Sequence, residues 1–257
     1  MSLFHALVLG VVEGLTEFLP VSSTGHLILV SGWLGLSGEA VKTFDVVIQT
    51  GALAAVVVLY RARLTAMKGP LFRNLAISFV PAAVAGVLLH KAIKAHLFGA
   101  GPVVAALAAG GVFMLGLDVW LRKRSPRAPL SLESLTARQA FVIGLAQCLS
   151  LWPGTSRAMV TMAAGLLLGL PPVAAAEYSF LLALPTLGAA TLFDAVQGGA
   201  GWIGQVGPLA VAAGFIGSAL TAALAIRGFI RWLTRQGLAP FGWYRLGLAG
   251  LVWKNFS

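Results

Sequence analysis

Two glutamates inside an apolar stretch near the N-terminus are the first residues whose chemistry needs an explanation. Glu13 and Glu17 are four residues apart in "VEGLTEFLPVSSTGHLILV" (12–30), so a helix places both carboxylates on one face. A charged side chain at the centre of a membrane helix costs about 2.5–3.5 kcal/mol, and two neighbouring acids also repel each other. We therefore expect a cation or a proton to hold this pair.

Three interpretations of the glutamate pair follow from this chemistry. Carboxylate oxygens suit a hard divalent cation, Mg²⁺ or Ca²⁺, shared with a phosphate, which makes Glu13 and Glu17 candidate metal ligands. A carboxyl group that keeps its proton is instead a candidate general acid or base. The structural alternative is a pair of glutamates that only form hydrogen bonds to neighbouring helices.

Hydroxyl residues and a histidine follow the glutamates. Pro20 breaks the helix, and "SSTG" (22–25) opens the next one, where free backbone N–H groups and the helix dipole attract phosphate. His26 lies three residues after Ser23, on the same side of that helix, as expected beside an activated nucleophile. Helix capping alone would also explain the hydroxyls, and a packed hydrogen bond would explain the histidine. The candidate catalytic residues here are Ser23 and His26, and the candidate phosphate ligands are Ser22, Thr24 and Gly25.

A single arginine follows a second proline break, in "WPGTSRAMVT" (152–161). Inside lipid the Arg157 guanidinium needs an anionic partner, and its planar fork matches phosphate oxygens in bidentate fashion. Arg157 is therefore a candidate catalytic residue, although a structural ion pair with Glu13 or Glu17 is the alternative. Arg245 is expected to extend to the membrane interface. Further candidates for substrate binding or for support of the site are Gln49, Gly154, Thr155, Ser156, Thr161, Asp45 and Glu177.

The composition of the 257-residue chain places these residues in a membrane protein. Hydrophobic residues make up 58% and charged residues 10%, against about 25% charged in soluble domains, and the mean hydropathy is +0.90. Apolar runs recur along the whole chain, so we expect one integral membrane domain over 1–257. The net charge of +10 comes from basic residues in short loops, which argues against nucleic-acid binding. The single cysteine, Cys148, excludes an internal disulfide.

The apolar runs predict an all-α polytopic fold with about six transmembrane helices plus two re-entrant helical hairpins. The hairpins are expected at 3–36 and 138–170, where a proline and small hydroxyl residues break each apolar segment midway. Such a broken backbone is tolerable in a membrane only where protein or a water-filled cavity covers it. The expected crossings lie near 45–60, 75–90, 101–121, 173–193, 207–227 and 240–254.

The two broken regions resemble each other, which indicates an internal repeat. Gly10 aligns with Gly144, Glu13 with Gln147, Pro20 with Pro153 and Ser23 with Ser156. Each half, about 1–125 and 135–257, is one hairpin followed by three crossings, so the second half must be inverted relative to the first. Inverted-topology repeats typically place the functional site on broken helices at the repeat interface. The hairpin tips should therefore meet, with Arg157 facing the acids, Ser23 and His26.

The distribution of basic residues predicts the orientation. The loops at 61–73, 122–138 and 227–235 fall on one face, whereas the opposite face carries Lys42, Lys91 and Lys94. The positive-inside rule makes the first face cytoplasmic, with both termini and the mouth of the first hairpin outside. The loop residues are Arg61, Arg63, Lys68, Arg73, Arg122, Lys123, Arg124, Arg127, Arg138, Arg227, Arg231 and Arg235.

The motifs resemble those of a known family over nearly the whole chain. "EGLTEFLPVSSTGH" and "PGTSRAMVT" are similar to the two signature regions of the bacterial undecaprenyl-diphosphate phosphatases of the bacitracin-resistance (BacA) type. The stretches "KTFDVVIQTGALAAVV", "AAEYSFLLALP" and "RQAFVIGLAQCLSLWPG" also fit that family. Where the family usually has a second serine after the arginine, this chain has Ala158, whereas Thr161 of the same motif is present.

The resemblance implies an integral enzyme of the bacterial plasma membrane. Its members hydrolyse undecaprenyl diphosphate to undecaprenyl phosphate and inorganic phosphate, recycle the lipid carrier for peptidoglycan synthesis and confer bacitracin resistance. The resemblance further implies dependence on a divalent cation and a site that opens outward. It assigns Ser23 as nucleophile or phosphate ligand, His26 as its partner in proton transfer and Arg157 as the residue on the diphosphate.

These lines combine into one hypothesis and two rivals. The diphosphate docks between the hairpin tips, held by Arg157, by helix N-termini and by a metal on Glu13 and Glu17, while His26 activates Ser23 or a water. Because inverted repeats with paired hairpins are typical of transporters, a lipid-phosphate flippase or ion-coupled carrier is the main rival. A membrane scaffold without catalysis would leave the acids and Arg157 without a purpose. The sequence leaves the metal's identity and the oligomeric state open, a homodimer included.

Overall fold

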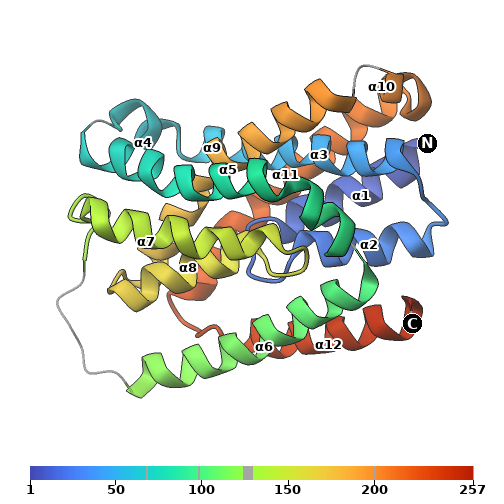
Figure 1. The fold of residues 1–257 in the computed structure, drawn as a ribbon. Helices are drawn as coiled ribbons and strands as arrows, with labels where there is room; N and C mark the ends of the chain where they lie inside the picture. The colour runs from blue at the N-terminus through green and yellow to red at the C-terminus, as the bar shows by residue number, and fades with distance from the viewer. Residues whose placement is uncertain (68, 98, 124–129, 199–200, 257) are drawn as a thin grey trace.

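The computed structural model describes residues 1–67, 69–97, 99–123, 130–198 and 201–256 (Figure 1). Every regular element in these ranges is a helix, and no strand occurs in them. The predicted all-α class is therefore confirmed. Of the basic loop residues, Lys68, Arg124 and Arg127 lie outside the described ranges, as does part of the connection between the two predicted repeat halves.

Five helices are long and apolar enough to cross a membrane, so the protein is a multi-pass membrane protein. They are α3 (Glu39–Leu59), α5 (Pro70–His96), α6 (Ala100–Lys123), α9 (Pro172–Gly198) and α11 (Pro208–Leu233). Large apolar side chains on these helices, such as Leu88 and Leu224, are exposed, as contact with lipid requires. The short helices α4 (Arg61–Ala66) and α10 (Gly201–Val206) lie in the connections.

The sixth predicted crossing is α12 (Ala239–Phe256), an 18-residue helix that packs along α6. It is not among the five helices that qualify as membrane spans by length and apolar composition in the described chain. Polar and charged residues such as Arg245 and Lys254 lower its hydropathy. The crossing by α12 therefore stays a prediction.

Two hairpins of short helices occupy the predicted broken regions. The first consists of α1 (Leu3–Thr16) and α2 (Ser23–Trp33), and the second of α7 (Ala137–Gln147), the 3₁₀ helix η1 (Cys148–Leu151) and α8 (Arg157–Leu168). The outer ends of α1 and α2 lie on the same side as both termini, whereas those of α7 and α8 lie on the opposite side (Figure 1). The segments that join the two helices of each hairpin, which we call the elbows, lie near the middle of the molecule.

The packing of the helices repeats between the halves. Helix α1 packs against α11, and α7 packs against α5, its counterpart when the halves are exchanged. The aligned glycines lie in these two contacts. A Cβ on Gly10 would overlap the backbone of Gly214, and one on Gly144 would lie 2.6 Å from the carbonyl oxygen of Ser78. The close approach of each hairpin to a long helix therefore depends on a glycine at the same position of each half, which supports the predicted internal repeat.

The two elbows end with the same backbone conformation. Ser22 and Ser156 have φ angles of 72° and 73°, and they are the only non-glycine residues with positive φ in the described chain. Each caps the following helix through its side chain, α2 in one case and α8 in the other. The structural counterpart of Ser156 is therefore Ser22 rather than Ser23, a shift of one residue from the sequence alignment. Ser23 and Arg157 correspond instead, as the first residues of their helices.

Candidate active site

An ion pair joins the two hairpins at their elbows. Arg157 Nη2 lies 2.8 Å from Glu17 Oε1, and each side chain is only 6% exposed. Glu17 directly follows α1, and Arg157 begins α8, so both side chains lie beside the proline breaks of their hairpins. The structure thus brings together the acid and the guanidinium from residues 140 positions apart. This pair is also the structural ion pair that the sequence offered as the alternative role of Arg157.

Glu17 also accepts a hydrogen bond from the candidate nucleophile. The Ser23 hydroxyl donates to Glu17 Oε2 at 2.7 Å, inside the protein. Both carboxylate oxygens of Glu17 are therefore occupied, one by Ser23 and the other by Arg157. The expected partner of Ser23 was His26, and in the structure that partner is Glu17.

Both ring nitrogens of His26 have partners other than Ser23, namely the backbone and the C-terminal helix. Its Nδ1 lies 2.7 Å from the Ser22 carbonyl oxygen, and its Nε2 lies 2.7 Å from the hydroxyl of Tyr244, against whose ring it stacks. Because a carbonyl only accepts, Nδ1 carries a hydrogen, and in the neutral ring Nε2 accepts from Tyr244. The expectation that His26 activates Ser23 directly does not match this geometry. The reason is the turn at Ser22, whose carbonyl captures the ring.

The other side of Arg157 is fixed by α9. Arg157 Nη1 donates to the carbonyl oxygen of Ser179 at 2.8 Å and to its hydroxyl at 3.2 Å. The Thr161 hydroxyl donates to the Ser179 hydroxyl at 2.7 Å, and the guanidinium carbon lies 5.6 Å from the centre of the Phe18 ring. Thr161 therefore supports Arg157 through Ser179. Nothing in the sequence singled out Ser179, because serine is an ordinary residue within an apolar helix.

Glu13 is the ionisable side chain of the site with the fewest hydrogen-bond partners. Its side chain is fully buried, and neither carboxylate oxygen has a hydrogen-bond partner among the described residues. Glu17, Asp45 and Arg157 lie within electrostatic range of it, and Asp45 Oδ1 is likewise buried without a hydrogen-bond partner. These orphaned carboxylate oxygens suit a cation. However, the described residues contain no cluster of three acids or histidines that is close enough to hold a metal.

Glu13 is thus a candidate ligand of a divalent cation as it stands. Glu17 becomes a second candidate ligand once one of its oxygens loses its present hydrogen-bond partner. Glu13 offers two oxygens that nothing else uses, whereas the oxygens of Glu17 already accept from Arg157 and Ser23. An anionic ligand that attracts the guanidinium would release Glu17 Oε1. A divalent cation therefore fits the two glutamates best together with a phosphate group, which supplies further oxygens.

The remaining candidates lie in the elbows and on α3. Ser22 accepts from the N–H of Gly25 at 3.4 Å, and Ser156 accepts from the N–H of Met159 at 3.3 Å, so both act as helix caps. Thr24, half-buried, lies in the first turn of α2. In the second elbow, Gly154 is buried, and the N–H of Thr155 donates to the Trp152 carbonyl. Gln49 lies one turn after Asp45 on α3, and the hydrogen bonds of the cluster, among the described residues, do not reach it.

Arg245 does not extend to the membrane interface as expected. Its side chain is fully buried, and its guanidinium donates to the carbonyl oxygens of Pro20, Ala106 and Gly154. An arginine side chain extends to the interface when its path to water is short. Here buried carbonyl oxygens accept the hydrogen bonds of the guanidinium instead. An ionisable residue in the middle of an apolar segment was the signal that could have placed Arg245 at the site.

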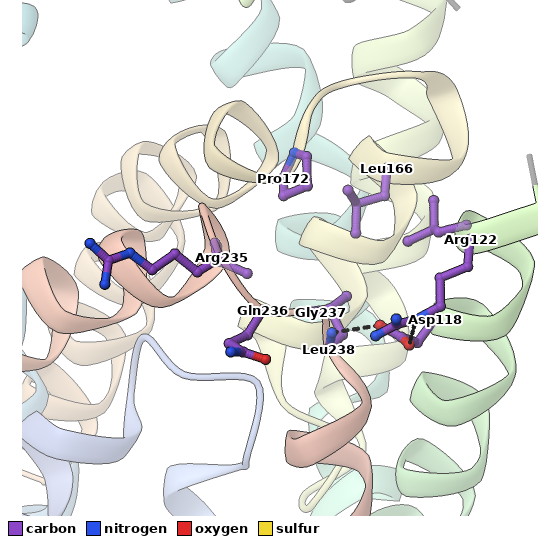
Figure 2. A pocket seen from close by; sticks show the side chains of 10 residues that line it. Asp118, Arg122, Leu166, Pro172, Arg235, Gln236, Gly237 and Leu238 are labelled. Atoms are coloured by element: carbon purple, nitrogen blue, oxygen red, sulfur yellow. Dashed lines mark hydrogen bonds and ion pairs between the residues drawn. The ribbon is translucent and has the colours of Figure 1, made fainter. Parts of the chain in front are cut away.

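A separate pocket of about 330 Å³ lies away from this cluster, beside the C-terminal ends of α6, α8 and α11 (Figure 2). Asp118 accepts there from the Leu238 N–H and from Arg122 Nε, both at 2.7 Å. None of the candidate site residues lines this pocket. The chemistry expected from the sequence therefore belongs to the buried cluster at the elbows.

The fold and the cluster define a class: a multi-pass all-α membrane protein with buried acids and a guanidinium between two helical hairpins. Within this class the chain matches the family described as bacitracin resistance protein BacA over residues 6–251, and it belongs to that family. A relative from Sorangium cellulosum named undecaprenyl-diphosphatase is 54% identical over 260 residues, which cover 97% of this chain and 85% of the relative. Another of that name, from Rhizorhabdus wittichii, is 45% identical over 266 residues and 98% of each chain. The resemblance found in the motifs is therefore confirmed.

Proposed function

We propose that this protein hydrolyses undecaprenyl diphosphate to undecaprenyl phosphate and inorganic phosphate. The names of its two relatives give the reaction, and one observation in this chain carries the proposal. That observation is the line of contacts Ser23–Glu17–Arg157, which joins a hydroxyl, a carboxylate and a guanidinium across the two hairpins. Hydrolysis of a phosphoric anhydride needs a positioned nucleophile, a proton acceptor and positive charge on the phosphoryl group.

The groups that would bind the diphosphate lie at the two elbows. Arg157 presents a planar fork that suits two phosphate oxygens, and its present partner Glu17 is an anion that a phosphate can replace. The first N–H groups of α2 and α8 follow the serine caps at Ser22 and Ser156, where the helix dipole favours negative charge. Both helix N-termini and Arg157 would thus hold the terminal phosphate between them.

The proton of the nucleophile has an acceptor in place. Ser23 donates its hydroxyl hydrogen to Glu17 Oε2, so Glu17 is the candidate general base. As Ser23 Oγ forms a bond to the terminal phosphorus, the bond from that phosphorus to the bridging oxygen breaks and the hydrogen moves to Glu17. Undecaprenyl phosphate leaves, and water then releases inorganic phosphate from Ser23. In the alternative route a water takes the place of Ser23 as nucleophile, and Ser23 only binds the phosphate.

The divalent cation expected from the sequence would be held by Glu13 together with Glu17. When bound, Mg²⁺ or Ca²⁺ would neutralise charge on the phosphate oxygens. Glu13 lies within electrostatic range of Arg157. His26, held by Tyr244, lies on the neighbouring turn of α2 and would orient the elbow rather than take the proton of Ser23.

The test is release of inorganic phosphate from undecaprenyl diphosphate by the purified protein in detergent, with Mg²⁺ or Ca²⁺ present. We expect release by the wild-type protein and a loss of about 100-fold or more in kcat for Glu17→Gln and for Arg157→Ala. Glu133→Gln, at an exposed acid paired with Arg63, serves as the matched control and should keep wild-type activity. Absence of release with either cation would favour the flippase or ion-coupled carrier, because detergent solution permits no transport.

The proposed setting is the bacterial plasma membrane, with both termini and the mouth of the first hairpin on the outer side. The positive-inside rule supports this orientation, since α6, which has Arg122 in its last turn, ends on the opposite side from both termini (Figure 1). Exposed apolar side chains on the long helices support contact with membrane lipids. A homodimer stays a prediction that the mass of the detergent complex would test.

A further inference from the structure

The guanidinium of Arg245 contacts three separate segments of the chain. Its Nη1 donates to the Pro20 carbonyl oxygen at 3.3 Å, and its Nη2 donates to the carbonyl oxygens of Ala106 at 3.1 Å and Gly154 at 2.8 Å. Pro20 belongs to the first elbow, Gly154 belongs to the second, and Ala106 lies on α6. A single side chain from α12 therefore connects both elbows to a long helix.

The carbonyl groups at the elbows need such a donor. Pro20 and Gly154 lie where the helical hydrogen-bond pattern stops, so their carbonyl oxygens lack the N–H group that a continuous helix would provide. Both residues are buried, and lipid offers no donor in place of water. A guanidinium carries several N–H donors in one rigid plane, which suits acceptors on opposite sides.

Arg245 has no acidic partner in the described chain. Its three acceptors are neutral carbonyls, and no ion pair to a carboxylate accompanies them. Burial of an arginine without a carboxylate is unfavourable, and its Nε is buried without a hydrogen-bond partner among the described residues. A hydrophobic residue would serve packing alone at lower cost, so the position calls for the donors themselves.

The surrounding backbone leaves the guanidinium little freedom. A Cβ on Gly110 of α6 would overlap the Arg245 guanidinium, and one on Gly154 would lie 2.6 Å from the Val103 carbonyl oxygen. Glycine at position 110 thus lets α6 lie close to the arginine, and glycine at position 154 lets the second elbow lie close to α6.

We propose that Arg245 is a positioning residue that holds the two elbows at the separation the reaction needs. Pro20 lies three residues after Glu17 and three before Ser23, and Gly154 lies three residues before Arg157. The two hydrogen bonds therefore fix the elbows close to the three groups that carry the chemistry. Because Arg245 is fully buried and its donors are used by backbone carbonyls, we assign it a role in position rather than in contact with the substrate. This inference rests on the proposed phosphatase activity for its catalytic consequence, but not for its structural one.

The test combines kinetics with hydrogen–deuterium exchange of the purified protein in detergent. Arg245→Met removes all three donors, and Arg245→Lys keeps the charge on a compact group that cannot reach all three carbonyls at once. We expect kcat to fall by about tenfold to a hundredfold in Arg245→Met, with KM within about threefold, because small displacements of reacting groups have effects of this order. Arg245→Lys should lie between this variant and the wild type. Amide exchange should rise in both elbows and in the first helical residues after them, 17–25 and 152–158, but not in α3.

The matched control is Asn74→Ala. Asn74 is also fully buried and donates to a distant backbone carbonyl, that of Leu135 at 2.6 Å, but it does so before the start of α7, far along the chain from the elbow. We expect this variant to melt at a lower temperature while kcat and the exchange of the elbows stay at wild-type values. This control distinguishes a lower stability of the whole protein from a displacement of the two elbows.

Two outcomes would overturn the inference. One is unchanged exchange in both elbows of Arg245→Met, whatever its activity. The other is a wild-type kcat together with wild-type amide exchange in Arg245→Lys. This second result decides the question even if Arg245→Met does not fold. If the wild-type protein releases no phosphate, the proposed function fails, but the exchange pattern still decides whether Arg245 holds the elbows.

Discussion

At the scale of single residues, the hydrogen bond from Ser23 to Glu17 changes which group we expect to accept the nucleophile's proton. A histidine three residues after the serine favours the histidine as acceptor, but the 2.7 Å contact of Ser23 is to the carboxylate of Glu17. The histidine is instead held at both nitrogens, by the Ser22 carbonyl and by Tyr244.

The role of Ser23 can be measured with Ser23→Ala. If Ser23 is the nucleophile, its removal should lower kcat by about 100-fold or more, and a phosphorylated Ser23 should be detectable by mass spectrometry after rapid acid quenching of the wild-type reaction. Ser31→Ala, a change of another buried serine on the same helix, is the control and should keep most of the activity. Near-wild-type activity of Ser23→Ala would mean that water attacks directly.

The buried carboxylate of Glu13 predicts a dependence on divalent cations. Chelation of the purified protein should abolish phosphate release, and Mg²⁺ or Ca²⁺ should restore it, because two neighbouring acids need a cation beside a phosphate. The cation should also raise the melting temperature of the wild-type protein in the presence of inorganic phosphate, and this rise should be lost in Glu13→Gln. Full activity in the presence of the chelator would contradict the prediction.

At the scale of helices, each hairpin is held against a long helix by a glycine. Gly10→Ala should lower the stability of the protein by about 1–3 kcal/mol, since its methyl group would overlap the backbone of Gly214 and push α1 away from α11. Thermal unfolding in detergent measures the effect. Gly116→Ala is the control, because that glycine of α6 has open space around its Cβ position, and removing a helical glycine there should add about 0.5–1 kcal/mol. Equal melting temperatures for the two variants would exclude the packing explanation.

The two aligned hairpins can also be compared position by position. Gly144 occupies in the second hairpin the place of Gly10 in the first, and Gln147 and Glu13 are both fully buried one turn further on. At this aligned position the second hairpin thus carries a neutral amide where the first carries an acid. Among the described residues, the buried acids Glu13, Glu17 and Asp118 lie in the first half, whereas Arg157 lies in the second.

At the scale of the whole molecule, the orientation in the membrane is open to a direct test. In a Cys148→Ala background, Lys254→Cys lies near the C-terminus and Gln236→Cys lies before α12, both at exposed positions. A membrane-impermeant maleimide should label residue 254 in intact cells, and residue 236 only after the membrane is opened, because basic loops stay in the cytoplasm. Equal labelling of the two positions would show that α12 does not cross, and the reverse pattern would invert the orientation.

Several properties follow from the sequence by itself. The apolar composition determines a membrane fold, since helices are the spanning elements that satisfy their own backbone in lipid. Pro20 and Pro153 determine where the hairpins break, and the rarity of charge in lipid singles out Glu13, Glu17 and Arg157. These are properties of single segments, and they can be evaluated without knowledge of which segments touch.

Only the tertiary structure decided the partners of the polar groups. Arg245 and Pro20 are 225 residues apart, and His26 and Tyr244 are 218 apart, so neither contact leaves a local pattern in the sequence. The register of the second elbow, which pairs Ser156 with Ser22, likewise needed the backbone angles. The packing of α1, α6, α8 and α12 determines which acceptors and donors lie within reach of these buried polar groups.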